Sequence, residues 1–195
     1  MPPKVKISRD SILDAAFELV RREGQGALNV RALANRLGCS TQPILYNFPT
    51  MDDLKDAVYQ QADRHHTACI LPKAGEGSDA LLELGLNYVR FGHEEKHLFR
   101  FLFESNRFGG MDMNALLRGP GVGELVGILA QGLGCSATEA EKVFLTFFAV
   151  AHGLASLLCH NAMEYDETEC AGMLETVFFG ALAALEEERN GKQHA

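Results

Sequence analysis

Residues 26–54, GALNVRALANRLGCSTQPILYNFPTMDDL, decide the fold of this chain. Asn29 stands before a short run with apolar residues at helical spacing, so we expect it to cap a helix. Gly38 stands just past that run, where a left-handed backbone is expected. Ser40 is then expected to cap a second short helix, which runs to about Tyr46. A short helix, a tight turn with glycine and a second helix together predict a helix-turn-helix.

The predicted helix-turn-helix covers residues 29–48, and its side chains divide into two sets. Four apolar residues are expected to pin it to a preceding helix at about residues 9–22: Leu33, Leu37, Ile44 and Phe48. Four others are left to face outward: Thr41, Gln42, Leu45 and Tyr46. The spacing matters because the second helix must project from the surface to enter a major groove.

Charge is distributed unevenly between the first fifty residues and the rest of the chain. The whole chain carries a formal net charge of −8, which by itself argues against nucleic-acid binding. Residues 1–50, however, hold seven basic and four acidic residues, whereas the rest holds 11 basic and 22 acidic residues. A basic head on an acidic body suits a protein whose first fifty residues meet phosphate.

Glycine and proline divide the remaining sequence into helical lengths, and no strand pattern is apparent. We therefore predict an all-α protein with three regions. A DNA-binding domain of three helices occupies residues 1–50, a connecting helix residues 51–70, and a helical bundle residues 71–195. No apolar run approaches about 18 residues, so no membrane-spanning helix is expected, and the default location is the cytoplasm.

Two long helices are expected to close the chain. The first begins after Ser136 or Thr138, and the second begins after Asp166 or Thr168. Both are apolar most of the way round, so each must be covered on more than one side. Because so small a chain has few layers, we expect a homodimer with a four-helix interface, two helices from each partner. The residues expected there are Leu154, Leu157, Leu158, Leu174, Val177, Phe178 and Leu182.

The stretch quoted above resembles the DNA-binding domain of TetR-family regulators. The resemblance rests on the run VRALANRLGCS at residues 30–40, the recognition helix after it, and an F-P-x-x-x-x-L entry into the next helix. It covers about residues 8–60, and the family's plan of about nine helices fits the remainder loosely. Residues 151–153, Ala-His-Gly, are similar to the Trp-His-Gly signature of one C-terminal subgroup, with the Trp replaced by Ala.

The resemblance implies a sequence-specific repressor whose partner is a double-stranded DNA operator. It places ten residues at or near the DNA: Asn29, Val30, Arg31, Ser40, Thr41, Gln42, Leu45, Tyr46, Asn47 and Lys55. Gln42 is the best base reader, because its amide can bond adenine at two atoms in the major groove. Arg31 and Arg36 are candidates for phosphate contacts.

Several positions depart from the family's usual pattern. Many members have a tyrosine where this chain has Leu45, and many open the next helix with a lysine where it has Met51. Both changes remove usual phosphate contacts, so either the affinity is modest or Tyr46 and Lys55 supply the contacts instead. Leu45 itself either touches a thymine methyl group or packs as an ordinary apolar residue. Asn47 replaces a usual aromatic residue or histidine.

The resemblance also implies a small-molecule effector in the C-terminal domain, which shifts the helix at 51–70 and spreads the two recognition helices of the dimer. Those helices should lie about 34–36 Å apart to reach successive major grooves. The expected pocket lining is aromatic with one polar group: Phe99, Phe103, Phe144, Phe147, Phe148 and His152. The alternatives are plain core for the phenylalanines and a core histidine bonded to a backbone carbonyl.

Other functions are less well supported by the sequence. It has no phosphate loop, nucleophile elbow, metalloprotease or dinucleotide motif, so neither an enzyme nor a cofactor is expected. Two rival hypotheses are a helical protein-interaction regulator with weakened DNA contacts and a redox or metal sensor built on Cys159 and Cys170. The five cysteines are odd in number and lack Cys-x-x-Cys spacing, which favours buried thiols in a reducing compartment.

Overall fold

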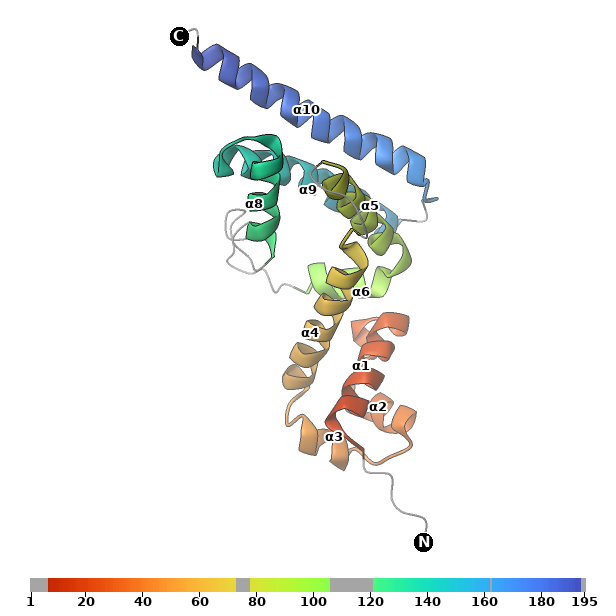
Figure 1. Ribbon diagram of the computed structural model, residues 1–195. Coiled ribbons are helices and arrows are strands. Elements are labelled where there is room, and N and C mark those ends of the chain that lie inside the picture. Colours follow the sequence, from red (N-terminus) through yellow and green to blue (C-terminus); the bar gives the residue numbers. More distant parts are fainter. Residues whose placement is uncertain (1–6, 73–77, 106–120, 162, 194–195) are drawn as a thin grey trace. The chain divides into compact units, whose positions relative to one another are not determined.

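The computed structural model describes residues 7–72, 78–105, 121–161 and 163–193, and these form nine α-helices, one short 3₁₀ helix and no strand (Figure 1). The predicted all-α class is confirmed. The helices are α1 (Arg9–Glu23), η1 (Gln25–Ala27), α2 (Val30–Leu37), α3 (Gln42–Asn47), α4 (Met51–Ile70), α5 (Ser78–Glu94), α6 (Lys96–Phe103), α8 (Val122–Leu133), α9 (Ala137–His160) and α10 (Glu167–Gln193). The chain divides into two compact units, Met1–Ala68 with Glu95–Arg107, and Cys69–Glu94 with Phe108–Ala195.

Side-chain caps fix where the helices of the N-terminal unit begin. The Ser8 hydroxyl accepts a hydrogen bond from the Ser11 amide at 3.0 Å, and the Ser11 hydroxyl oxygen accepts one from the Ser8 amide at 3.1 Å, which closes a capping box at α1. Asn29 caps α2 as predicted, since its Oδ1 accepts from the Ala32 amide at 2.9 Å. Thr50 accepts from the amide of Asp53 at 3.1 Å and so caps α4.

The turn between α2 and α3 has the predicted left-handed glycine but a different helix start. Gly38 has φ 61° and ψ 35°, as the C-cap of α2 requires. The prediction that Ser40 caps α3 is wrong, because Thr41 occupies the N-cap position in helical backbone and makes no side-chain cap bond. A cap side chain bonds the second or third amide of its helix, and Pro43, the second residue of α3, has no amide hydrogen to offer.

Apolar residues from the first four helices meet in the core of the N-terminal unit. Ile12 of α1 and Leu54 of α4 are completely buried, and three of the four residues expected to pin the helix-turn-helix are buried with them: Leu33, Ile44 and Phe48. Leu37 is half-buried. This packing holds α3 at the surface, because Ile44 within the helix and Phe48 at its C-cap both lie in the core.

Helix α6 clusters with the N-terminal unit, although its residues lie in the range expected for the C-terminal bundle. Arg21 Nε of α1 donates to both carboxylate oxygens of Glu95 at 2.9 Å, and Arg21 Nη2 donates to the same carboxylate. The ring edge of Tyr59 on α4 packs against Phe101, with ring centroids 5.9 Å apart. An ion pair at the start of α6 and aromatic contacts along it therefore fasten this helix to α1 and α4.

The C-terminal unit is built on close packing of α5 against α9 and α10, with α8 against α9. Gly92 of α5 permits this approach, because a Cβ built on it would lie 2.7 Å from the Ala155 Cβ and 3.0 Å from the Ala155 carbonyl oxygen. Gly85 has the same role nearer the start of α5, where an added Cβ would collide with the ring of Phe147. A larger residue at Gly92 must push the two helices apart because it meets the Ala155 backbone, whereas one at Gly85 must displace the Phe147 ring.

Ion pairs tie the ends of the C-terminal helices together. Arg189 of α10 donates from Nε and Nη2 to the two carboxylate oxygens of Glu139 on α9, each at 2.9 Å. This guanidinium and the Ser136 cap hold the pKa of Glu139 well below its usual range. Arg90 of α5 donates to Glu167 at 2.8 Å and lowers the pKa of that carboxyl as well.

Two helices of this unit are more apolar on average than the absence of a long uninterrupted apolar run suggests. By length and composition alone, Ala137–His160 and Glu167–Gly191 are apolar enough to cross a membrane, contrary to the expectation that no helix is. Their apolar residues are interspersed with small and polar ones, which is why no long run is visible. This is weak evidence for a membrane, because central helices of globular proteins pass the same test. Much of their apolar surface is left uncovered within one chain.

Candidate nucleic-acid interface

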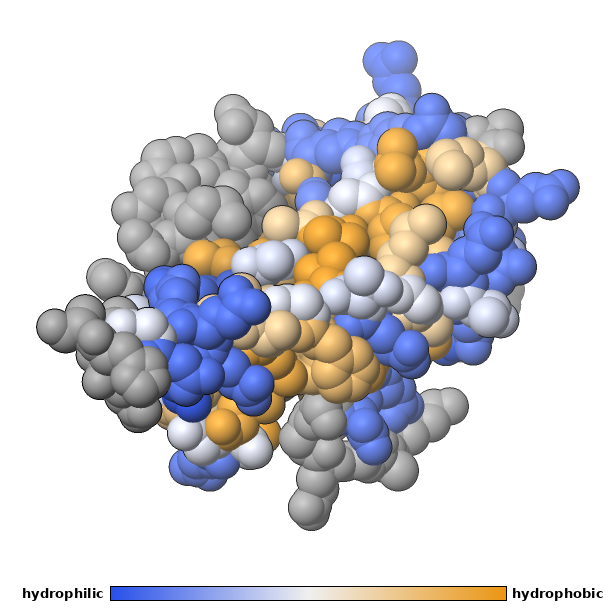
Figure 2. Space-filling view, turned by 90° about the horizontal axis from the view of Figure 1, so that it is seen from above, coloured by the Kyte–Doolittle hydropathy of each residue, from blue (hydrophilic) through white to orange (hydrophobic). Residues whose placement is uncertain are grey.

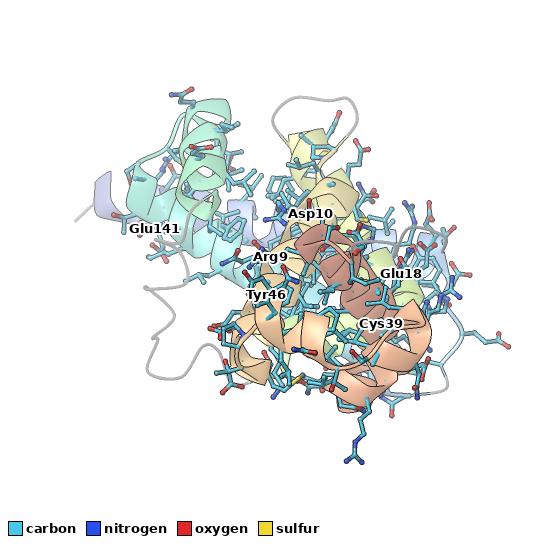
Figure 3. The ribbon with its side chains drawn as sticks, turned by 90° about the horizontal axis from the view of Figure 1, so that it is seen from below. Arg9, Asp10, Glu18, Cys39, Tyr46 and Glu141 are labelled. Atoms are coloured by element: carbon cyan, nitrogen blue, oxygen red, sulfur yellow. The ribbon has the colours of Figure 1, made fainter. Side chains whose placement is uncertain are left out.

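Helix α3 presents a polar and aromatic face at one end of the N-terminal unit. Ile44 of this helix is buried, whereas Tyr46 is 86% exposed and Leu45 is 47% exposed. Gln42 and Thr41 at the start of the helix are also exposed. Figure 3, which views the molecule from below, shows Tyr46 projecting on this side. The four residues predicted to face outward do so, on a helix held from behind by its apolar side chains.

The N-terminal end of α2 supplies a second group of candidate DNA contacts. The side chain of Asn29 is occupied by capping, since Nδ2 also donates to the Ala27 carbonyl at 3.1 Å. Its role at this position is therefore to order the helix start. Val30 is half-buried, whereas Arg31 and Arg36 are exposed. Arg31 and Arg36 are the members of this group with the chemistry for phosphate.

The remaining predicted DNA contacts differ in how far their side chains are already engaged. Ser40 is exposed in the turn. Asn47 is half-buried and donates to the Pro43 carbonyl at 2.8 Å, so its amide closes the last turn of α3. The Lys55 ammonium lies 3.6 Å from Asp52 with 43% of its side chain exposed, a weak surface pair that phosphate can replace.

The residues predicted to line an effector pocket fall into both units. Phe99 and Phe103 of α6 belong to the N-terminal unit, where their rings lie 4.9 Å apart and Phe103 meets the ring of His66. Phe144, Phe147, Phe148 and His152 belong to α9 in the C-terminal unit. Phe147 is buried against Phe178, which is a core contact.

A buried tyrosine orders His152, and sequence reasoning did not single it out. The Tyr88 hydroxyl of α5 lies 2.9 Å from Nδ1 of His152, and its ring packs edge-on against Phe148. Burial raises the pKa of Tyr88, so its hydroxyl stays protonated, and the hydrogen bond that it shares with Nδ1 fixes the orientation of the imidazole. Tyr88 lies on the apolar face of α5, three residues after Gly85 and four residues before Gly92. This helical spacing is the sequence signal that would have found it.

The residues predicted for dimerisation are divided between core and surface. Leu158, Leu174 and Phe178 are buried within one chain. Leu154, Val177 and Leu182 are half-buried, and Leu157 is 49% exposed. Met173 and Phe179 of α10 are also about half exposed. Seen from the side of α10, apolar surface gathers in a band between hydrophilic margins (Figure 2).

The cysteines offer little to a redox or metal sensor. Cys159 and Cys170 are both buried, and burial raises the pKa of the Cys170 thiol, which disfavours the reactive thiolate. Within the residues that the structure describes, no three side chains of His, Cys, Asp or Glu are grouped closely enough to hold a metal ion. The burial of both thiols is the observation that weighs against the redox hypothesis.

Comparisons with known proteins find relatives of the helix-turn-helix segment and of most of the chain. Residues 12–58 match the family described as bacterial regulatory proteins, tetR family. An uncharacterized HTH-type transcriptional regulator of Mycobacterium tuberculosis is 27% identical over 168 residues, 84% of this chain and 76% of that protein. The tetracycline repressor protein class D of Escherichia coli is 31% identical over 77 residues, 40% of this chain and 35% of that protein.

Solved structures share the fold at low sequence identity. A tetR-family transcriptional regulator of Streptomyces coelicolor has a TM-score of 0.67 and 19% identity, over 92% of this chain and 83% of that one. A TetR-like transcriptional regulator of a Rhodococcus species has a TM-score of 0.61 and 16% identity, over 90% and 96%. Residues 12–58 therefore resemble the tetR family, and the chain shares its overall fold with these solved structures. The likeness of residues 151–153 to a Trp-His-Gly subgroup stays a prediction.

Proposed function

We propose that this protein is a homodimeric, sequence-specific transcriptional repressor that a small-molecule effector releases from its operator. The observation that carries the proposal is the outward face of α3, where Gln42, Leu45 and Tyr46 are exposed while Ile44 anchors the helix in the core. The first fifty residues, which include this face, hold more basic than acidic residues. With DNA as its partner, the protein is proposed to act in the cytoplasm.

On DNA, the exposed residues of α3 would divide between bases and phosphates. The Gln42 amide can bond adenine at two atoms, and the Tyr46 hydroxyl can donate to a phosphate in place of the usual tyrosine one residue earlier. Leu45, at 47% exposure, is accessible enough to touch a thymine methyl group. Thr41, Ser40, Arg31 and Lys55 would supply phosphate contacts around the reading helix.

The uncovered surface of α9 and α10 is proposed as the interface with a second copy of the chain. A groove of about 470 Å³ between these helices is lined by small and branched residues, among them Thr146, Val177, Gly180 and Ala184. The same helices expose the projecting side chains Leu157 and Phe179. Grooves and projecting side chains on one face are what a two-fold symmetric contact needs, since each copy offers both. Leu154 and Leu182 would join the contact, and Leu158, Leu174 and Phe178 would support it from behind.

The effector is proposed to bind against the aromatic face of α9. Phe144 and Phe148 stack with nearly parallel rings, 6.1 Å between centroids, and His152 follows on the same face. The hydrogen bond between Nδ1 of His152 and the Tyr88 hydroxyl fixes the imidazole beside these rings, so a mainly apolar effector with a polar group of its own suits this face. Release from DNA would follow from a higher affinity of the effector for a dimer with another spacing of its heads.

A gel-shift assay with the DNA that flanks its own gene tests the proposal. We expect a specific, salt-sensitive band that Gln42→Ala weakens by roughly tenfold or more, because a bidentate base contact is lost. Gln60→Ala, an exposed glutamine of α4 in the same unit, is the matched control and should leave the band unchanged. Absence of any specific band at low salt would contradict the proposal, and equal weakening by both variants would contradict the assignment of Gln42.

A further inference from the structure

Arg9, the first residue of α1, is held over a ring that closes the recognition helix. Its guanidinium carbon lies 4.5 Å from the centroid of the Phe48 ring, and Phe48 is the C-cap residue of α3. Phe48 is buried in the core while Arg9 is exposed, so the planar guanidinium covers the ring on the solvent side. The contact joins the N-terminus of α1 to the end of α3 within one unit (Figure 1).

The stability of α1 does not explain a cation at this position. The N-terminal end of a helix carries a partial positive charge, which opposes a basic residue in the first turn. Arg21 and Arg22 stand in the last turn of the same helix, where the dipole favours them, and both pair with Glu18. Among the residues that the structure describes, no carboxylate lies within 4.0 Å of Arg9.

In the part of the chain that the structure describes, no hydrogen bond or ion pair takes up the N–H donors of this guanidinium. Stacking uses one flat face of the group, whereas its five N–H donors point outward in the plane. Tyr46, only two residues before Phe48, is the most exposed large hydrophobic residue among those described in the N-terminal unit. A guanidinium fixed by stacking loses little further freedom when it binds a planar pair of phosphate oxygens.

We propose that Arg9 is a further DNA contact, a bidentate phosphate ligand that Phe48 holds in place beside the recognition helix. This inference rests on the proposed DNA-binding function and adds α1 to the elements that touch the backbone, whereas the residues predicted from the sequence all lie between 29 and 55. The contact is with phosphate, so it fixes the register of α3 on the duplex and carries no base preference of its own.

Salt-dependent binding to a fluorescein-labelled duplex of random sequence tests the contact, because phosphate binding does not require the operator. From fluorescence anisotropy, we expect Arg9→Ala to weaken binding roughly threefold to tenfold and to reduce the slope of log Kd against log salt by about one. Arg9→Lys keeps the charge but not the planar fork, so it should preserve the slope and lose some of the affinity.

Arg22→Ala is the matched control, since it removes the same charge from the other end of α1, where the side chain is 69% exposed. We expect it to leave the slope unchanged, and thermal melting checks that each variant is folded. Phe48→Leu, which removes the ring and keeps an apolar side chain, should make the Arg9→Ala loss smaller. If Arg9→Ala and Arg22→Ala have the same slope as the wild type, Arg9 serves only to cover Phe48 and the inference is overturned. Wild-type protein that binds neither this duplex nor the DNA flanking its own gene would instead overturn the proposed function.

Discussion

The two units of this chain reach stability in different ways. The N-terminal unit uses short helices of 8 and 6 residues, fixed by an asparagine cap, a left-handed glycine and a small core that one chain completes. The C-terminal unit uses helices of 24 and 27 residues whose apolar surface a single chain covers incompletely. A unit that is complete alone can project a reading helix into solvent, whereas an incomplete one needs a second copy. Under the proposed function, this difference gives DNA recognition to the first unit and assembly to the second.

The sharpest test of this comparison is a pair of neighbouring phenylalanines on α10. Phe178 is fully buried, whereas Phe179 is 54% exposed. We expect Phe178→Ala to lower the free energy of unfolding by about 3–5 kcal/mol, because it leaves a cavity in the core. Phe179→Ala should change folding little but weaken self-association, as measured by sedimentation equilibrium. Equal effects of the two variants on folding, with no change in association, would remove the evidence for an incomplete unit.

Acid should affect the two units in different pH ranges. Burial, with a smaller contribution from the His65 charge, lowers the pKa of His66 on α4 from 6.5 to about 4. Between these values the unfolded chain binds a proton that the folded one does not, so stability is lost as pH falls from 6.5 to about 4. At pH 5 the loss is about 2 kcal/mol. The lowered pKa values of Glu139 and Glu167 instead give stability that persists above pH 4.5 and is lost only below it.

Hydrogen exchange resolved by peptide measures this difference. We expect α4 peptides to lose protection between pH 7 and pH 5, after correction for the intrinsic rate, while α9 peptides keep theirs. His66→Gln should abolish the change, and His160→Gln, at an exposed histidine of α9, should not. Parallel loss of protection in both helices would mean that the two units respond to acid as one.

The smallest expected effect concerns the tether of α6 to the N-terminal unit. Glu95 is 15% exposed and receives the bidentate contact of Arg21, so Glu95→Gln should cost on the order of 1 kcal/mol and speed exchange in α6. Glu18→Gln, which alters the longer and more exposed pairs of Arg21 and Arg22, should cost a few tenths. If the two variants are equally mild, α6 is held by its apolar contacts alone.

Local chemistry made much of the N-terminal unit predictable from the sequence. The Asn29 cap, the left-handed Gly38 and the burial of Ile44 each follow from a few neighbouring residues, and the structure confirms them. The prediction for the start of α3 was wrong. Ser40 is a residue type that favours a helix cap, but the third residue after it is Pro43, which has no amide hydrogen for the cap to bond. A prediction from local sequence therefore fails where one residue lacks the hydrogen-bond donor that a neighbouring residue needs.

Long-range packing made the rest of the site unpredictable. Which faces of α9 and α10 are covered depends on α5, so the sequence could not separate buried Leu158 and Leu174 from exposed Leu157. The hydrogen bond between Tyr88 and His152 joins residues 64 apart, and no periodicity reports such a pair. The stacking of Arg9 on Phe48 likewise joins two helices across a core that only the fold assembles.

The most direct test of the account is selection of bound duplexes from a pool of randomised DNA, followed by sequencing. A dimer that reads DNA with two copies of α3 should enrich a palindrome whose half-sites lie about one helical turn apart, roughly 10 base pairs between centres. Tyr46→Ala should reduce recovery across all sequences, whereas Gln42→Ala should relax the preference at one position of each half-site. Recovery of a single half-site would contradict the dimer, and recovery of no enriched sequence would contradict specific DNA recognition itself.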